Sequence, residues 1–392
     1  MNYDRYLNRA IAAVPPSGIR RFFDMASTMK GTISLGVGEP DFLTPYHIRN
    51  AAIDSLLRGE TQYTANRGLP ELREAVSRYM RERFSLSYDP KTDIVITVGA
   101  SEAIDVALRA ITGPGDEILV PEPSYVSYSP SVIFAGGVPV PIVTRQEREF
   151  RLDADALRAA ITPRTKALIL PYPNNPTGAI MPRADLEKIA EVVREKEILV
   201  LSDEIYCELT YGEEPHTSFG SLPGMLPYTV TLNCFSKSFA MTGWRVGFVC
   251  APAPIAEIIN KIHQYTILCA PRQSQAAALH ALEQGFADGF ADVARMRQSY
   301  DQRRRLMVAG FRDMGLDCFE PLGAFYVFPS IRSTGLTSEE FCQRLLREKK
   351  VACVPGTAFA PSGEGHIRCS YATGLDKLNI ALERMADFIR AL

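Results

Sequence analysis

The segment FSKSFAMTGWRVGF, residues 235–248, places a lysine where lysines are uncommon in soluble proteins. Lys237 lies among phenylalanine, alanine and methionine residues, and it closely follows the strand-like run TVTLNCF, residues 229–235. A lysine that is partly shielded from water loses its proton more readily than an exposed one and can then act as a nucleophile. A second cation, Arg245, follows eight residues later. The segment therefore predicts a functional lysine at the end of a strand.

Apolar strands alternate with helical patterns on the N-terminal side of this segment. Continuous apolar strands joined through helices predict an α/β fold, with a mostly parallel sheet that helices cover on both faces. The expected strands are DIVITV (93–98), DEILVP (116–121), KALILPYP (166–173), EILVLSDE (197–204), YTVTLNCF (228–235) and VGFVCA (246–251). The expected helices between them cover residues 101–111, 124–135 and 183–196.

A change of pattern after residue 286 indicates a second, smaller domain. Residues 287–314 have the pattern of one long charged helix, and shorter α/β units follow to the C-terminus. Since 392 residues exceed what one small core can organise, two domains are expected. We predict a large domain at 49–286, a small α/β domain at 287–392, and an N-terminal segment, 1–48, that forms an arm and part of the small domain.

The composition argues against several classes of protein. A net charge of −2 offers no basic surface to nucleic acid or to an anionic membrane. The eight cysteines form no C-x-x-C pair, which favours free thiols in a reducing cytosol, and the five histidines share no metal-ligand spacing. No stretch approaches the roughly 20 apolar residues of a membrane span. We expect a cytoplasmic protein without a metal, nucleic acid or membrane partner.

Polar groups follow four of the expected strands, at the sheet edge where α/β proteins bind ligands. Residues 99–101 open a helix and offer free N–H groups to a phosphate, and Asn175 follows the strand at 166–173. Asp203 ends a strongly apolar strand, where a carboxylate is costly without a nearby cation. Each feature alone also fits a plain turn or a helix cap. Together with Lys237 they fit pyridoxal 5'-phosphate, which has a phosphate, a basic ring nitrogen and an aldehyde.

Six short motifs occur along the chain in a fixed order. They are SLGVGEPDF (34–42), YTANRGLPELREA (63–75), YPNNPTG (172–178), SDEIY (202–206), FSKSFAMTGWRVG (235–247) and HIRCSY (366–371). In this order and spacing the sequence resembles the class I, aspartate- and aromatic-aminotransferase-like enzymes of pyridoxal-phosphate fold type I, nearly from end to end. The resemblance implies a seven-stranded, mostly parallel sheet in the large domain, a pyridoxal 5'-phosphate cofactor, and a homodimer with shared active sites.

The resemblance also implies roles for single residues. Lys237 would form a Schiff base with the cofactor and then move the substrate proton, and Asp203 would pair with the ring nitrogen. Arg368 would bind the substrate α-carboxylate through a two-pronged contact that lysine cannot make, beside the backbone N–H of Gly38. Asn175 and Tyr206 would contact the ring oxygen, and Asn175 would also lie beside the substrate. Tyr125 would stack on the ring. The residues implied at the phosphate are Gly99, Ala100, Ser101, Ser236 and Arg245, together with Tyr63 from a second subunit.

Several further positions are either departures from the family pattern or are expected to be structural. Cys234 stands where family members often place serine or glycine near the phosphate, and Tyr125 stands where many have tryptophan, which weakens the stacking. Trp244 is expected to pack rather than to touch substrate. The basic run at 303–305 is expected to be the solvated face of the long helix. Arg272 is expected to form an interface ion pair, with a substrate contact as the less favoured interpretation.

Three functions are compatible with this pattern. Transamination between an amino acid and a 2-oxo acid is favoured, and the same cofactor would also support a C–S lyase, a decarboxylase or a cyclopropane-forming synthase. A cofactor-binding sensor domain of a transcription regulator is disfavoured. Such a regulator needs a fused DNA-binding helix-turn-helix, and the 33 residues that precede SLGVGEPDF are too few for one.

The substrate side chain is the least determined feature. The stretch KIHQYTILCAP, residues 261–271, is expected to be a strand–helix stretch that reaches the neighbouring subunit's site. Its Tyr265 stands where the dicarboxylate-specific branch of the family has an arginine. We expect an aromatic or broad range of donors, with aspartate left open, and 2-oxoglutarate as an acceptor.

Overall fold

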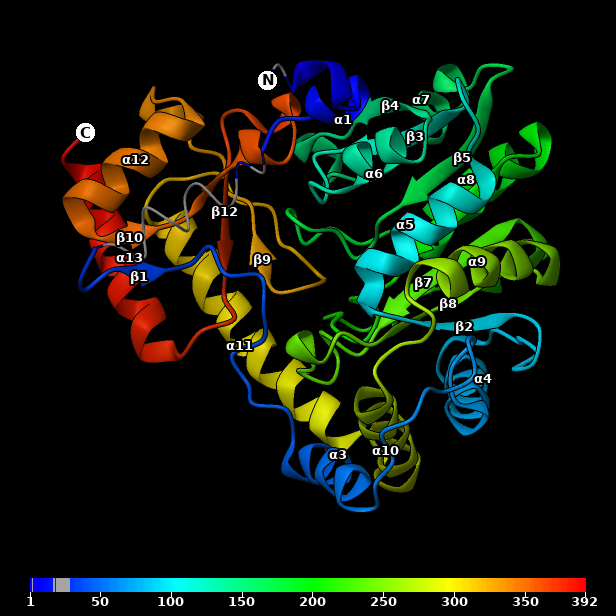
Figure 1. Cartoon of the computed structure of the whole chain (residues 1–392). Coiled ribbons are helices and arrows are strands. Elements are labelled where there is room, and N and C mark those ends of the chain that lie inside the picture. The colour runs from blue at the N-terminus through cyan, green and yellow to red at the C-terminus, as the bar shows by residue number, and fades with distance from the viewer. Residues whose placement is uncertain (2, 17, 19–28) are drawn as a thin grey trace.

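A seven-stranded sheet forms the centre of the larger part of the molecule (Figure 1). The computed structural model describes residues 1, 3–16, 18 and 29–392. The strand order is β2-β8-β7-β6-β5-β3-β4, and β8 runs antiparallel to both neighbours while the other pairs are parallel. The mostly parallel sheet is therefore confirmed. The strands are β2 (Ile94–Thr97), β3 (Glu117–Glu122), β4 (Val138–Val143), β5 (Thr165–Leu170), β6 (Leu199–Asp203), β7 (Thr229–Cys234) and β8 (Gly247–Cys250).

Helices cover both faces of this sheet because successive strand residues point to opposite sides. Side chains of α5, α6 and α9 share one apolar cluster with alternate strand residues, and those of α4, α8 and α10 share clusters with the other set. The helices in this part are α3 (Tyr46–Leu57), α4 (Pro70–Phe84), α5 (Gly99–Ile111), α6 (Tyr128–Phe134), α7 (Ala154–Ala160), α8 (Arg183–Lys196), α9 (Ala253–Thr266) and α10 (Arg272–Asp288).

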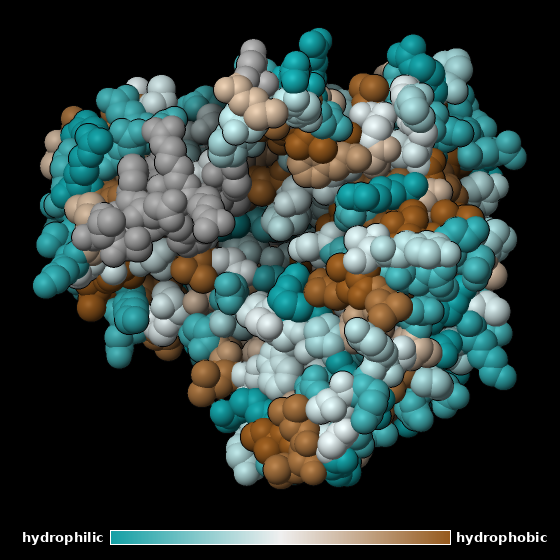
Figure 2. Space-filling view, in the orientation of Figure 1, coloured by the Kyte–Doolittle hydropathy of each residue, from teal (hydrophilic) through white to brown (hydrophobic). Residues whose placement is uncertain are grey.

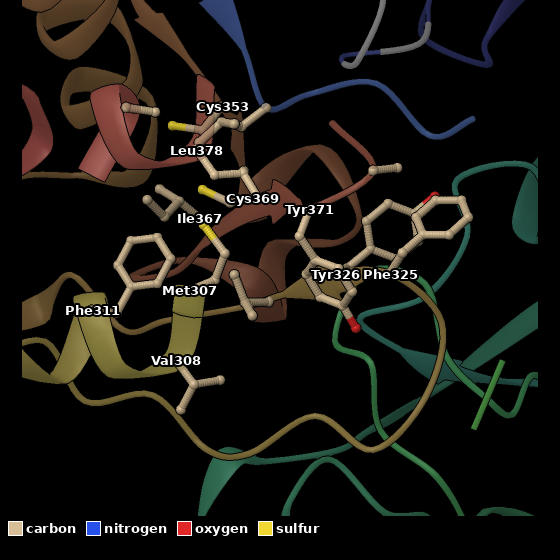
Figure 3. Packing of buried hydrophobic residues seen from close by; sticks show 14 of the residues in the cluster. Met307, Val308, Phe311, Phe325, Tyr326, Cys353, Ile367, Cys369, Tyr371 and Leu378 are labelled. Carbon is tan, nitrogen blue, oxygen red and sulfur yellow. The ribbon is translucent and has the colours of Figure 1, made fainter. Parts of the chain in front are cut away.

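A second apolar core brings the C-terminal elements together with a short N-terminal strand (Figures 1 and 3). Figure 3 shows Met307 and Phe311 of α11 packed beside Ile367 and Cys369 of β12. The strands are β1 (Ile33–Ser34), β9 (Tyr326–Val327), β10 (Val351–Ala352), β11 (Val354–Pro355) and β12 (Ile367–Ser370). The helices are α11 (Ala291–Asp313), α12 (Ser338–Lys349) and α13 (Leu375–Arg390). The domain boundaries given above remain a prediction.

Short elements complete the described chain. In the part of the chain that the structure describes, no helix is both long enough and apolar enough to cross a membrane. The N-terminal turn is α1 (Arg9–Ala12), and the 3-10 helices are η1 (Asp4–Tyr6), η2 (Gln146–Arg148), η3 (Phe219–Ser221), η4 (Leu226–Tyr228), η5 (Thr242–Trp244), η6 (Arg332–Thr334), η7 (Gly356–Ala358) and η8 (Pro361–Gly363).

The long helix expected at 287–314 is interrupted near its start. Helix α10 ends at Asp288, Gly289 and Phe290 both adopt positive φ, and α11 begins at Ala291. Glycine at this position ends a helix at little steric cost. Phe290 is buried in the core beneath α4 and α10, so tertiary packing fixes the break.

Three other expectations were wrong in detail. The stretch 261–271 is the end of α9 followed by a loop, not a strand and a helix. Helix α6 begins at Tyr128 rather than at residue 124. Strand β4, which carries two prolines, was not among the expected strands. It lies at the sheet edge, where a missing backbone N–H is tolerated.

The basic run at 303–305 is mostly buried, contrary to expectation. Arg303 contacts both carboxylate oxygens of Asp41 at 2.8 Å, and only Arg305 has an exposed side chain. Arg304 bonds to Asp301 and Glu320. Buried arginines require such partners. Asp301 is local, but nothing in the run reveals that Asp41 and Glu320 supply the others.

Candidate active site

Lys237 lies in the turn after β7, at the carboxyl end of the sheet. Its Nζ donates a hydrogen bond to the carbonyl oxygen of Gly38 at 2.5 Å, and it lies 5.9 Å from the centre of the Tyr206 ring. Burial lowers the pKa of Lys237 to about 8. The amine is therefore neutral in a far larger fraction of molecules near pH 7.5 than an exposed lysine would be.

Asp203, the last residue of β6, is a buried carboxylate. The hydroxyl of Tyr128 donates to its Oδ2 at 2.7 Å, and the N–H of Ile205 donates to its Oδ1 at 3.3 Å. Burial raises the pKa of Asp203 to about 6, although both hydrogen bonds oppose that rise. Tyr128 also meets Tyr125 edge to face, with ring centroids 5.6 Å apart.

Arg368, on β12, is buried without a carboxylate among its described hydrogen-bond partners. Its Nη1 donates to Oδ1 of Asn175 at 2.9 Å, and its Nη2 donates to the carbonyl oxygen of Gly36. The guanidinium lies 4.5 Å from the centre of the Tyr326 ring. A buried cation paired only with neutral groups carries an unbalanced charge, so this position favours an anionic ligand.

Tyr326 joins the two halves of the site. It comes from β9, and its hydroxyl lies 3.0 Å from the hydroxyl of Tyr206, which follows β6. Both rings are buried, and a Cβ added at Gly38 would lie 2.9 Å from the Tyr326 hydroxyl. Sequence reasoning missed Tyr326 and Tyr128. The only signal for Tyr128 was its spacing of three residues from Tyr125, and Tyr326 had none.

Residues 99–101 and Arg245 form a cationic turn beside these groups. Gly99 adopts φ +75° at the start of α5, and a Cβ there would lie 2.6 Å from Nη2 of Arg245. The guanidinium also donates from Nη1 to the carbonyl oxygen of Thr242 at 2.9 Å. Free N–H groups at a helix start and an adjacent arginine suit an anion. In the same region Ala100 is partly buried, Ser101 is exposed and Ser236 is buried.

The structure also locates the other positions that the sequence singled out. Tyr63, in the segment between α3 and α4, has an exposure of 80% in the single chain, and Tyr265 has one of 84%. Arg272 pairs with Glu60 of the same chain at 3.7 Å. Trp244 packs against the core and donates to Oγ1 of Thr44, which confirms the expected packing. Cys234 is buried at the end of β7.

Comparison with known proteins places this chain in a family. The family model described as "Aminotransferase class I and II" matches residues 30–385. An aspartate aminotransferase of Pyrococcus abyssi is 47% identical, with 96% of each chain covered, and aromatic-amino-acid aminotransferase 2 of Thermococcus litoralis is 44% identical, with 98% of each covered. The solved aromatic aminotransferase of Pyrococcus horikoshii is 45% identical, with a TM-score of 0.90 over 94% of this chain and 99% of that one. The chain therefore belongs to the class I and II aminotransferases.

Proposed function

We propose that this aminotransferase binds pyridoxal 5'-phosphate at Lys237. The observation that carries the proposal is that one sheet edge holds both an amine with a pKa of about 8, that of Lys237, and the buried carboxylate of Asp203. When bound, the cofactor supplies an aldehyde that amines join reversibly and a ring that withdraws electrons from the substrate α-carbon. The chain has a group of the right chemistry for each part of that molecule.

The fit of the cofactor rests on the 99–101 turn and Arg245 as well as on Lys237 and Asp203. The backbone at Gly99 lies so close to Arg245 that a side chain would fill the space. This turn would hold the phosphate through N–H groups, with Ser101, Ser236 and Arg245 adding side-chain donors. Tyr125 would cover the ring, and Asn175 and Tyr206 would donate to its oxygen. Burial raises the pKa of the Cys234 thiol, so this neutral group would add no charge to the site.

Each of the chain's own groups has a distinct task in this proposal. Lys237 would hold the cofactor and then carry a proton at its Nζ to and from the substrate α-carbon. Asp203 is ionised above about pH 6 and, held by Tyr128, would keep the proton on the ring nitrogen. Arg368 would bind the substrate α-carboxylate in place of its present bond to Asn175, beside the Gly38 backbone.

The proposed donors are aromatic amino acids or a broad range of amino acids, with 2-oxoglutarate as an acceptor. The names of the Thermococcus litoralis and Pyrococcus horikoshii relatives support an aromatic donor, and so does the tyrosine rather than arginine at position 265. Aspartate is the second candidate donor, because the Pyrococcus abyssi relative of similar identity is an aspartate aminotransferase.

We also propose that the working unit is a cytoplasmic homodimer. The exposed Tyr63 would enter the partner's phosphate site, and Tyr265 would lie near the partner's substrate. All eight cysteines are free thiols, which supports a reducing compartment.

The test combines cofactor attachment with product analysis. The purified chain should become yellow with added pyridoxal 5'-phosphate, and borohydride reduction followed by mass spectrometry should find the adduct on Lys237. Lys237→Ala should show neither. A panel of amino acids should then yield 2-oxo acids in equal amount to the amino acid formed from 2-oxoglutarate. A chain that stays colourless and unmodified overturns the cofactor proposal, and release of ammonia or CO2 instead of amino-group exchange overturns the reaction.

A further inference from the structure

A partly buried glutamate and a fully buried histidine form a hydrogen-bonded pair next to the 99–101 turn. Glu102 stands in the first turn of α5, and its Oε1 lies 2.6 Å from Nδ1 of His263 in the last turn of α9. Its other oxygen, Oε2, accepts the backbone N–H of Val98 at 2.5 Å. His263 is fully buried, and its Nε2 has no partner among the described residues. Neither Glu102 nor His263 was a candidate from the sequence.

The pair fixes the backbone that precedes the helix. Val98 is the residue before α5, so its N–H has no partner within the helix. Glu102 reaches back to this N–H in the manner of a capping box, and the histidine holds the carboxylate in that orientation. Burying an imidazole together with most of a carboxylate costs more than burying two apolar side chains would. In return for that cost, the pair gives the peptide group of Val98, directly before the 99–101 turn, a defined orientation.

The same turn is also fixed by close packing against strand β8. A Cβ at Gly247 of β8 would lie 2.9 Å from the backbone carbon of Gly99 and 3.0 Å from the nitrogen of Ala100. Strand β8 therefore constrains the turn itself, and the Glu102–His263 pair constrains the residue before it. Two separate contacts thus fix the backbone of residues 98–100, which is the preorganisation that anion binding rewards.

We propose that Glu102 and His263 are positioning residues that set the affinity of the 99–101 turn for the cofactor phosphate. The inference rests on the proposed function, in which this turn binds the phosphate. His263 orients Glu102, Glu102 orients the Val98 peptide, and the turn keeps its N–H groups directed at the anion. His263 also supplies the carboxylate with a hydrogen-bond donor, so that Glu102 does not turn toward the phosphate.

The experiment compares two ligands that differ only in the phosphate. Dissociation constants of full-length, cofactor-free protein are measured for pyridoxal 5'-phosphate and for pyridoxal, by absorbance. His263→Leu should weaken binding of pyridoxal 5'-phosphate about tenfold, the scale of one hydrogen bond to a charged group, and leave pyridoxal unchanged. His263→Asn should restore most of the loss, because its amide N–H can replace Nδ1–H. The 31P resonance of the bound cofactor should shift in His263→Leu but not in His263→Asn.

A double-mutant cycle tests whether the two residues act as one unit. Glu102→Ala, and the double variant that combines it with His263→Leu, should each bind pyridoxal 5'-phosphate about tenfold more weakly than the wild type. His263→Leu alone should show the same loss of affinity. Glu257→Gln removes an exposed carboxylate from the same helix as His263, paired with Arg67, and serves as the control that changes neither constant.

The outcomes separate this inference from the proposed function. Wild-type protein that binds no pyridoxal 5'-phosphate refutes the proposed function. Wild-type binding together with variants that bind both ligands normally, or that lose both ligands equally, overturns the positioning role. A thermal unfolding curve checks each variant, and a lowered midpoint with an unchanged ratio of the two constants also overturns it. Additive losses in the cycle overturn the pairing.

Discussion

Burial changes the acid–base behaviour of two residues in opposite directions. The ammonium of Lys237 is disfavoured, so its pKa falls to about 8, and the carboxylate of Asp203 is disfavoured, so its pKa rises to about 6. Between pH 6 and 8 the carboxylate is charged and the amine is partly neutral. Both groups then have the protonation state that the proposed chemistry requires, within the pH range of a cell.

The first prediction concerns the pH dependence of Lys237. Only the neutral amine attacks an aldehyde, so the rate at which cofactor-free protein attaches pyridoxal 5'-phosphate should rise with pH through about 8 and level off above it. Stopped-flow absorbance between pH 6 and 10.5 provides the measurement. A rate that continues to rise up to pH 10.5, as for a lysine with the ordinary pKa, would contradict the lowered value.

At the scale of elements, the decisive contact is between β8 and the start of α5. Gly247 brings a strand backbone against the backbone at Gly99 and Ala100, at distances that no Cβ allows. Through this contact an antiparallel strand inserted into a parallel sheet helps to shape the turn proposed to bind the phosphate. It also explains why positions 99 and 247 are glycines, since a side chain at either position would not fit.

The second prediction is that Gly247→Ala damages both stability and cofactor binding. Its new Cβ would lie 2.9 Å from backbone atoms of Gly99 and Asn233, so the strand and the turn must separate. Overpacking of this kind lowers the free energy of unfolding by roughly 1–3 kcal/mol. The midpoint of thermal unfolding and the affinity for pyridoxal 5'-phosphate should both fall. Gly243→Ala is the matched control, because a Cβ there meets nothing within 4 Å. Indistinguishable behaviour of the two variants would disprove the prediction.

At the scale of the whole molecule, exposed apolar side chains gather on helix α3, which fits the proposed dimer. Leu57 of α3 is 80% exposed, and Ile53 and Leu56 on the same helix are also exposed. Figure 2 shows apolar atoms gathered over α3 at the bottom of the view. A contiguous apolar surface is costly in water and is typical of a protein–protein interface. Tyr63 follows shortly after this helix, in the segment that the proposal places in the partner's site.

The third prediction is that the sites are shared between two subunits. The chain should sediment as a dimer at micromolar concentration. In mixed dimers of Tyr63→Phe and Lys237→Ala subunits, the one site that keeps Lys237 would receive Tyr63 from its partner. That site should bind pyridoxal 5'-phosphate with wild-type affinity. Unshared sites would instead show the weakened affinity of the Tyr63→Phe homodimer, and a monomer would end the proposal.

The sequence alone determined the features that depend on local pattern. Apolar runs of strand length, spaced by helical periods, predicted the parallel sheet and the bounds of α8, because period and composition are properties of neighbouring residues. Strand ends predicted that Gly99, Asn175, Asp203 and Lys237 would lie at one edge, because parallel strands deliver their carboxyl ends to the same side. The motif order predicted the family, which the comparisons confirm.

Only the tertiary structure decided which distant residues touch. Tyr128 on Asp203, Tyr326 on Tyr206 and His263 on Glu102 are pairs separated by 75 to 161 positions, and nothing near either member reveals the other. The same holds for the burial of Arg303 against Asp41. At the break before α11, Gly289 is a local signal, but the burial of Phe290 is not. Local propensity is worth less than the burial and charge pairing that folding brings about, so these features became visible only in three dimensions.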